Sequence, residues 1–270
     1  MPLLIESVKA FIDTEQIQPF SIYSSVKEQH ILNVPIIKPL LIFVLDGEKN
    51  LKGETTTVCP TGSFVFLSNS PNTDMRNIPS EREYFALLIE FELEDFSVFD
   101  RRSKRPSEHL IGAISDGLAK TIIQFIEWSQ FTPATMWSIR RKEILQYLYY
   151  LGHEGVANLS DIPSISHQVY SMISADVAED VSTGMDELCG RLAMSESTLR
   201  RRLKSEGTSL QGLKDQAKLS YGLHLLQTTK YTIQTIASNC GYQSQSRFTQ
   251  RFKQRFGLTP TDLRKTKLTD

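Results

Sequence analysis

The chain has 270 residues, of which 40% are hydrophobic and 23% are charged, as in ordinary globular proteins. This length fits two domains or one large domain. The three cysteines, Cys59, Cys189 and Cys240, are too few and too scattered for a disulfide framework or a clustered metal site. The chain shows no signal-peptide pattern and no apolar run near the ~18 residues that span a bilayer. We therefore expect a cytoplasmic protein without a membrane partner.

Charge is divided unevenly along the chain, although the net charge is only −1. Residues 1–167 carry 15 Lys and Arg against 21 Asp and Glu, whereas residues 168–270 carry 15 against 10. A basic C-terminal part behind an acidic N-terminal part predicts that only the C-terminal part meets a polyanion. Chance segregation of surface charge is the alternative.

Short apolar or β-branched runs predict strands between about Ile31 and Phe99. The expected strands cover residues 39–45, 55–59, 63–67 and 84–90. Asp46-Gly47 predicts a hairpin, residues 60–62 predict a second turn, and the Asn/Ser/Pro-rich residues 68–73 predict a third. Strands at this spacing indicate a β-sandwich or barrel, and their order is similar to that of a cupin-type barrel.

Two amphipathic helices should follow the strands. The first covers about residues 115–130, is capped by Ser115 and is broken at Pro133. The second covers about residues 134–151 and stops at Gly152. The pair can pack on the barrel or against a second copy. The overall class is α+β, with a regulatory or dimerisation domain at 1–155, a linker at 156–168 and an all-helical domain at 169–270.

An enzymatic role finds little support in the N-terminal part. None of the five histidines falls in the predicted strand region, which argues against a metal-dependent cupin enzyme. No catalytic constellation appears, so we predict no catalytic residue, no metal and no cofactor. A DNA-repair alkyl acceptor would need an activated thiolate, but Cys189 and Cys240 should lie on inner helix faces and Cys59 in a strand.

The last hundred residues contain a weak internal repeat. Residues 185–195 match residues 233–243 in apolar positions, in a small mid-helix residue and in a turn residue, Ala193 in one copy and Gly241 in the other. A helix-turn-helix needs a small residue for the close crossing and a turn residue that tolerates a tight reversal. Gly241 suits that turn better than Ala193, because a Cβ makes the left-handed conformation costly.

A second helix should follow each turn, at 196–206 behind Ser195 and at 245–256 behind Ser244. Leucines or phenylalanines form a narrow buried stripe on each helix, and polar residues occupy the opposite face. The buried stripes are Leu199 and Leu203 in the first helix, and Phe248, Phe252 and Phe256 in the second. The polar faces carry Ser197, Arg200, Arg201 and Lys204 in the first, and Gln245, Ser246, Arg247, Gln250 and Gln254 in the second.

These polar faces suit the major groove of double-stranded DNA. Arg can donate two hydrogen bonds to guanine, Gln can pair with adenine, and Ser can serve either. The cations expected to contact phosphates are Lys204, Arg251, Lys253 and Arg255. A solvated face on an ordinary surface helix is the alternative for one such helix, but two of them behind matching turns favour DNA binding.

One long helix over residues 209–227 should join the two units. At ~1.5 Å per residue it spans roughly 28 Å, close to the ~34 Å of one DNA turn. The two recognition helices can then enter successive major grooves on one face of the duplex, with some DNA bending.

The C-terminal segment resembles the DNA-binding domain of the AraC/XylS family of bacterial transcription regulators. The matching positions, in family order and spacing, are Ile236, Ala237, Gly241, Tyr242, Ser244, Phe248, Phe252, Lys253, Phe256, Gly257, Pro260 and Arg264. The first unit departs from the pattern at Cys189, Ala193 and Leu203, and the joining helix departs at Lys218 and Gly222. The resemblance implies base contacts from Ser197, Arg200 and Arg201 in the first unit, and from Gln245, Ser246, Arg247 and Gln250 in the second.

The resemblance also implies partners. We expect a DNA-binding regulator, an activator that contacts RNA polymerase, with an N-terminal domain that senses an effector or forms a homodimer. Whether that effector is a small molecule or a protein is left open by the sequence. A cupin enzyme with an accessory DNA-binding domain is the more distant alternative.

Overall fold

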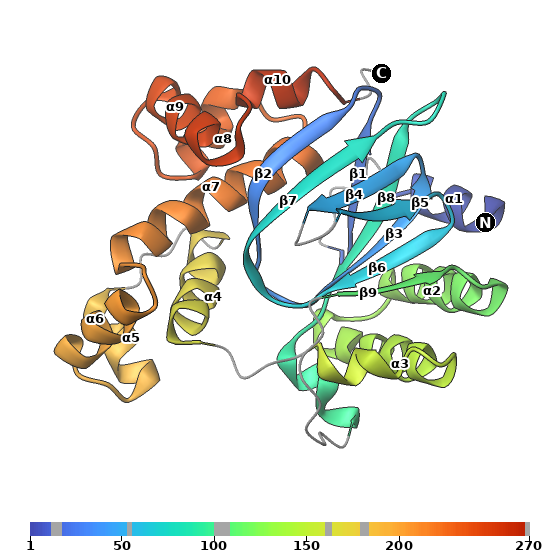
Figure 1. Cartoon of the computed structure of the whole chain (residues 1–270), viewed down its shortest axis with the longest axis horizontal. Helices are drawn as coiled ribbons and strands as arrows, with labels where there is room; N and C mark the ends of the chain where they lie inside the picture. The colour runs from blue at the N-terminus through green and yellow to red at the C-terminus, as the bar shows by residue number, and fades with distance from the viewer. Residues whose placement is uncertain (12–17, 53–55, 100–108, 160–163, 179–183, 268–270) are drawn as a thin grey trace.

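The computed structural model describes residues 1–11, 18–52, 56–99, 109–159, 164–178 and 184–267. Figure 1 shows two parts: a sheet-rich N-terminal domain flanked by helices, and a helical C-terminal domain beside it. The class is α+β, as expected. None of the described helices is both long and apolar enough to cross a membrane.

Within the described residues, the N-terminal strands form two antiparallel sheets that face each other. The first sheet has the order β1-β8-β3-β6-β9 and the second the order β2-β7-β4-β5. Apolar side chains from both inner faces, such as Ile42, Val65, Leu51 and Met75, share one buried cluster. The strands are β1 (Ser21–Ser25), β2 (Gln29–Ile36), β3 (Leu40–Asp46), β4 (Glu48–Lys52), β5 (Thr56–Pro60), β6 (Ser63–Leu67), β7 (Ser70–Ile78), β8 (Tyr84–Glu90) and β9 (His109–Ala113).

Asp46-Gly47 is a corner between the sheets, and the hairpin predicted there is wrong. β3 pairs with β6 and β8 in the first sheet, whereas β4 pairs with β5 and β7 in the second. Gly47 has φ +75°, and a Cβ at this position would lie 2.5 Å from the carbonyl oxygen of Ile78. The Asp-Gly signal reports a local reversal, but the long-range partners of each strand decide which sheet it joins.

Five strands, β1, β2, β4, β7 and β9, lie outside the predicted strand positions. β1 and β9 are edge strands with mostly half-exposed side chains, so they lack a clear apolar alternation. β7 begins at Ser70, inside the predicted turn at 68–73, because its polar sequence pairs on both sides with β2 and β4. His30 and His109 therefore lie in strands, contrary to the prediction. The described residues nevertheless contain no cluster of three metal-binding side chains.

Helices cover the outer face of the first sheet, as Figure 1 shows. The helix pair predicted after the strands is confirmed as α2 (Asp116–Ser129) and α3 (Trp137–Tyr150), and a further helix, α1 (Pro2–Lys9), packs beside α2. Ser115 caps α2 by accepting a hydrogen bond from the backbone N–H of Leu118 at 3.2 Å. Phenylalanines of the sheet, including Phe43, Phe64 and Phe85, pack against these helices in the largest buried cluster. Short 3-10 helices lie at η1 (Leu93–Val98), η2 (Ala134–Met136) and η3 (Glu154–Asn158).

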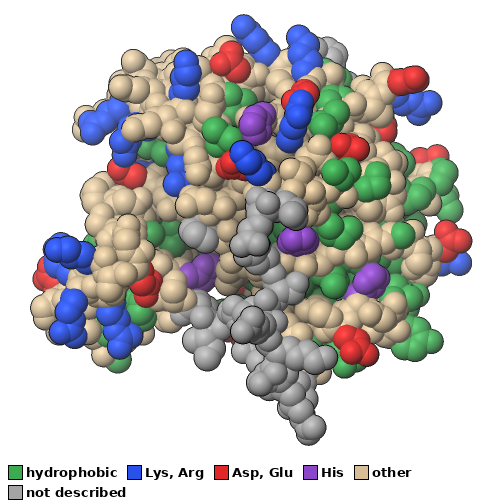
Figure 2. All heavy atoms as spheres, in the orientation of Figure 1, with side chains coloured by type: hydrophobic (Ala, Val, Ile, Leu, Met, Phe, Trp, Pro, Cys, Tyr) green, Lys and Arg blue, Asp and Glu red, His purple; other side chains and the backbone are tan. Residues whose placement is uncertain are grey.

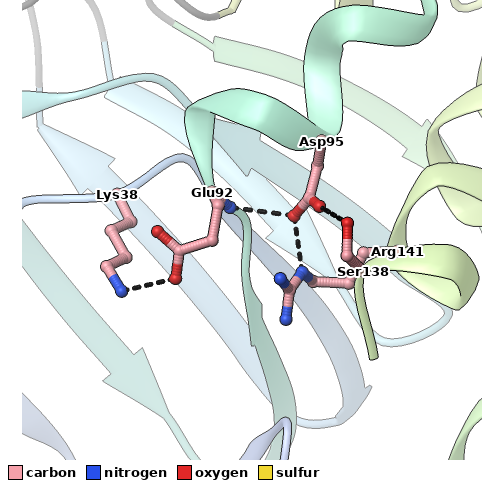
Figure 3. Close-up of polar contacts among 5 residues, drawn as sticks. All are labelled: Lys38, Glu92, Asp95, Ser138 and Arg141. Carbon is pink, nitrogen blue, oxygen red and sulfur yellow. Dashed lines mark hydrogen bonds and ion pairs between the residues drawn. The ribbon is translucent and has the colours of Figure 1, made fainter. Parts of the chain in front are cut away.

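A buried carboxylate ties η1 to α3 (Figure 3). Asp95 is fully buried and accepts hydrogen bonds from Ser138 Oγ at 2.6 Å and Arg141 Nε at 2.5 Å. It also accepts the backbone N–H of Glu92, whose own carboxylate pairs with Lys38 at 2.6 Å. Because each oxygen of Asp95 has a partner, the charge can be buried without a large penalty.

The C-terminal domain is all helical within the described residues. Its first helix, α4, begins at Ile165, and Ile165, Val169 and Tyr170 form a buried stripe on it. The preceding 3-10 helix, η3, contains the buried Val156. Both elements overlap the range predicted as a linker, 156–168, of which residues 160–163 lie outside the described part. The helices are α4 (Ile165–Ala178), α5 (Met185–Leu192), α6 (Glu196–Ser205), α7 (Leu210–Thr228), α8 (Ile233–Asn239), α9 (Gln245–Phe256) and α10 (Pro260–Arg264).

Candidate nucleic-acid interface

The long helix α7 carries both helix-turn-helix units. Ser209 caps it by accepting the backbone N–H of Gly212 at 3.1 Å, as a helix starting after this residue requires. Leu213 and Ala217, on its first half, pack with α4, α5 and α6. Leu223 and Leu226, on its second half, pack with α8, α9 and α10. The predicted joining helix is therefore confirmed, and it connects two separate hydrophobic cores.

The first unit consists of α5, a tight turn and α6. Ala193 adopts the left-handed conformation at the turn, with φ 50°, as the repeat predicts for this position. Ser195 then caps α6 by accepting the backbone N–H of Thr198. Leu199 and Leu203 are buried against the core and fix the rotation of the helix about its axis.

The opposite face of α6 points away from its core. Ser197, Arg200, Arg201 and Lys204 are all exposed, so the structure brings the first set of predicted contacts together on one helix. Arg200 forms an (i, i+4) ion pair with Glu196 at 2.6 Å. Both side chains are largely exposed, so this pair is weak and a nucleic acid can compete for the guanidinium.

The second unit repeats this arrangement with better turn chemistry. Thr232 caps α8, Gly241 makes the turn with φ +69°, and Ser244 caps α9. Three phenylalanines anchor α9: Phe248, Phe252 and Phe256 are each fully buried, and their successive rings meet in tilted and edge-to-face contacts with centroids 5.5 and 4.7 Å apart.

Gly222 of α7 permits the close approach of the second unit. A Cβ added there would lie 2.8 Å from the ring of Phe248 and 3.2 Å from Cys240 Sγ. This departure from the family's usual Ala therefore has a packing cause: the α8–α9 pair sits close to the backbone of α7.

The outer face of α9 carries the second set of predicted contacts. Gln245, Ser246, Arg247, Gln250 and Lys253 are all exposed on it. Figure 2 shows Lys and Arg side chains gathered over α5 and α6, and again over the region of α8 and α9. These two positive regions belong to the two units that α7 connects.

The four cations predicted to contact phosphates fall into two pairs. Lys204 and Lys253 are exposed and available. Arg251 is half-buried and pairs with Asp215 of α7 at 2.7 Å. Arg255 is also half-buried and points to the N-terminal domain, where its Nη2 donates to Asn72 Oδ1 at 2.9 Å. Burial lowers the pKa of Arg255 from its ordinary value.

A carboxylate that the sequence analysis did not single out joins the first unit to α4. Glu206 follows α6, and its two oxygens accept the backbone N–H groups of Ile165 and Ser166 at 3.2 and 2.7 Å. Desolvation raises the pKa of Glu206, but the hydrogen bonds from the start of α4 outweigh it, so the net pKa is lowered. Since the partners lie about forty residues apart, no local pattern signals this contact.

Two of the cysteines, Cys59 and Cys240, are buried. Burial raises the pKa of the Cys59 thiol to about 11 and that of Cys240 to about 12. A nucleophilic alkyl acceptor requires the opposite shift.

A model of the helix-turn-helix domain matches residues 188–266 of this chain. The transcriptional regulator AdiY of Escherichia coli is 33% identical over 96 residues, which cover 36% of this chain and 37% of AdiY. The regulator GadX of Escherichia coli is 30% identical over 100 residues, covering 37% of this chain and 36% of GadX. The chain thus spans about a third of the length of these curated relatives, over its C-terminal domain.

Solved structures extend the likeness to the whole fold. ToxT of Vibrio cholerae superposes with a TM-score of 0.65 over 93% of this chain and 98% of its own, at 15% identity. ToxT with a bound unsaturated fatty acid gives a TM-score of 0.61 over 92% and 95% of the two chains. These identities establish a common fold only. The helix-turn-helix match and the identities with AdiY and GadX show that the C-terminal part of this chain is a helix-turn-helix domain similar to that of these transcriptional regulators.

Proposed function

We propose that this protein binds double-stranded DNA in a sequence-specific manner and regulates transcription, as an activator acting in the cytoplasm. One observation carries the proposal. Two N-capped helices, α6 and α9, are each anchored by a buried apolar stripe and present exposed Arg, Gln or Ser side chains on the other face. That combination places bidentate donors and acceptors on rigid helices, as major-groove recognition requires.

The proposed base contacts are those on the exposed faces of the two helices. They are Ser197, Arg200 and Arg201 of α6, and Gln245, Ser246, Arg247 and Gln250 of α9. Lys204 and Lys253 are the exposed cations best placed to contact the flanking phosphates. α7 has 19 residues, so at ~1.5 Å per residue its length approaches one turn of DNA.

A DNA-binding measurement on the full chain tests this proposal. Genome-wide mapping of bound sites supplies promoter fragments, and mobility shifts at physiological salt compare them with bulk DNA. We expect the mapped fragments to bind at least a thousandfold more tightly, the lower end for specific sites. Arg82→Ala, at an exposed N-terminal position, is a charge-matched control that should leave binding unchanged. No preference for any fragment over bulk DNA would overturn the proposal.

We further propose that the N-terminal sandwich takes a small-molecule effector. Solved structures of ToxT hold an unsaturated fatty acid and a naphthalenyl-butenoic acid. In this chain, the inner face of the sandwich contains the ammonium group of Lys49, a residue that is 3% exposed. Its Nζ donates a hydrogen bond to Asn77 Oδ1 at 2.7 Å and lies 5.6 Å from the ring centroid of Tyr84. Burial lowers the pKa of Lys49 to about 8, so the group is mainly charged at neutral pH and suits an organic anion.

Thermal unfolding with an unsaturated fatty acid tests this effector class. We expect saturating ligand to raise the melting temperature of the wild type, and Lys49→Met to abolish that rise while preserving the fold. An equal rise in both proteins would exclude Lys49 as the anchor.

The outer surface of the helix pair supports a protein contact as well. Phe131, Met136, Ile139, Tyr149 and Tyr150 are exposed on α3 and on the segment that precedes it. We propose that this apolar surface forms a homodimer, and that the DNA-bound protein contacts RNA polymerase. Sedimentation of the wild type and of Ile139→Glu tests the dimer: a dimer that survives the substitution would place the interface elsewhere. Capture of a different protein through the same surface would favour the partner-sensing alternative.

A further inference from the structure

Strand β2 of the N-terminal domain contacts the second helix-turn-helix unit directly. Ile31, in the middle of β2, is 5% exposed and belongs to the same buried cluster as Phe252 and Phe256 of α9. Next to it, the side chain of Leu32 lies so close to Gly257 that a Cβ at Gly257 would be 3.0 Å from Leu32 Cδ1. β2 therefore packs against the C-terminal end of α9, as Figure 1 also shows.

Asn33 makes the polar part of this contact. It lies at an irregularity in the β2–β7 pairing, between Ile31 and Val34, and has φ 51°. Its backbone N–H donates to Asp74 Oδ1 at 2.9 Å, and its side-chain Nδ2 donates to the carbonyl oxygen of Arg255 at 3.1 Å. Asn is one of the few residues that tolerate this backbone conformation, so the irregularity and the amide act together.

The acceptor of that hydrogen bond is a carbonyl in the last turn of a helix. The last four carbonyls of a helix have no partner within it, and Arg255 is the penultimate residue of α9. Asn33 thus supplies a C-terminal cap from another domain. A second hydrogen bond, from Arg255 Nη2 to Asn72 Oδ1 of β7, holds the same residue by its side chain.

Arg255 lies on a different face of α9 from the side chains proposed to contact bases. It lies five residues after Gln250, which at ~100° per residue puts it about 140° around the helix. Gln250 and Lys253 stay exposed while Arg255 is half-buried against β7. The N-terminal domain therefore holds α9 without covering the side chains proposed to read bases.

We propose that β2 positions the second recognition helix, that Asn33 is a positioning residue that caps α9, and that Arg255 couples the domains and does not bind phosphate. This inference rests on the proposed DNA-binding function. Because Asn33 and Asn72 lie on paired strands of the sandwich, a change in that sheet reaches α9 through two hydrogen bonds to one residue.

Hydrogen exchange without DNA tests the cap in the full-length protein. In Asn33→Gly the backbone keeps its left-handed conformation and only the amide is lost. We expect the last-turn amides of α9 to exchange about fivefold faster, as the loss of one hydrogen bond implies, whereas α6 should not change. Asn33→Asp, which keeps the shape but replaces the donor with a carboxylate, should have at least the same effect. Unchanged exchange in both variants would overturn the cap.

Salt-dependent DNA binding tests the role of Arg255. We expect Arg255→Ala and Asn72→Ala to weaken specific binding several-fold, with the slope of log K against log salt equal to that of the wild type. Lys253→Ala should reduce that slope by about one, as the loss of a phosphate contact does. A slope reduced by about one in Arg255→Ala, or tighter binding by Asn33→Gly, would overturn the proposal. Failure of the wild type to bind any DNA would refute the proposed function, but the exchange experiment would still decide whether Asn33 caps α9.

Discussion

The two turns of the helix-turn-helix units offer a matched test of backbone strain. Ala193 and Gly241 occupy equivalent positions and have similar left-handed conformations, with φ of 50° and 69°. The left-handed conformation costs an L-residue about 1–2 kcal/mol, whereas glycine loses roughly 0.5–1 kcal/mol more conformational entropy on folding than alanine. The difference predicts that Ala193→Gly stabilises the fold by about 0.5–1 kcal/mol and that Gly241→Ala destabilises it by a similar amount.

Little else in the structure should alter these values. A Cβ at Gly241 would meet only the flexible end of Lys218, with Nζ at 2.9 Å. The two turns belong to separate hydrophobic clusters, so the double variant should return to nearly wild-type stability.

Urea denaturation followed by circular dichroism measures both changes, read as midpoint shifts at constant slope. Gly190→Ala is the internal control: Gly190 lies within α5, and a Cβ there would meet nothing within 4 Å. It should stabilise the fold by about 0.5–1 kcal/mol, because the backbone is helical at that position. If Ala193→Gly lowers the stability, or if Gly190→Ala and Gly241→Ala shift the midpoint in the same direction, the strain argument fails.

Three further predictions concern recognition and pH. Arg201→Ala and Arg247→Ala should each cost about 1–3 kcal/mol in specific binding and relax the sequence preference at one base pair. Unchanged specificity in mobility shifts would refute the proposal that the exposed faces of α6 and α9 contact bases. Lys204→Ala should weaken binding to all sequences alike and lower the salt slope by about one, and a loss confined to one sequence would contradict a phosphate contact. Glu206→Gln should destabilise the fold at pH 7, because folding lowers the pKa of Glu206 from its ordinary 4.5 and the carboxylate therefore stabilises the fold above that pH. The difference from wild type should shrink as the pH falls through the lowered pKa, and a difference that persists at low pH would mean that the charge of Glu206 contributes nothing.

The helix-turn-helix units could be predicted in detail because their signals are local. The N-caps at Ser195, Ser209 and Ser244, and the buried stripes of α6 and α9, depend on residues within one or two turns of each other. Helical periodicity then determines which side chains share a face. The left-handed turn at Ala193 was predictable for a different reason: the internal repeat aligns this residue with Gly241.

Strand pairing in the N-terminal domain was less predictable. The expected strands exist, but Asp46-Gly47 joins two different sheets, and β1, β7 and β9 have polar or mixed sequences that become strands only through their neighbours. Pairing partners are chosen by burial and backbone hydrogen bonding across the whole domain.

By itself, the sequence determined the two recognition helices, their caps, their exposed Arg, Gln and Ser faces, and the basic character of the C-terminal part, because these follow from residues near one another in the chain. Only the tertiary structure decided what distant segments do to those helices. A helical projection puts Arg255 beside the buried Phe248, at the edge of the apolar stripe, but it does not show that β2 and β7 meet this end of α9. Nor does it show that Glu206 finds its partners at the start of α4. The physical reason is that a helix's own period defines its faces, whereas the domain that covers a face comes from contacts over 40 to more than 200 residues of sequence.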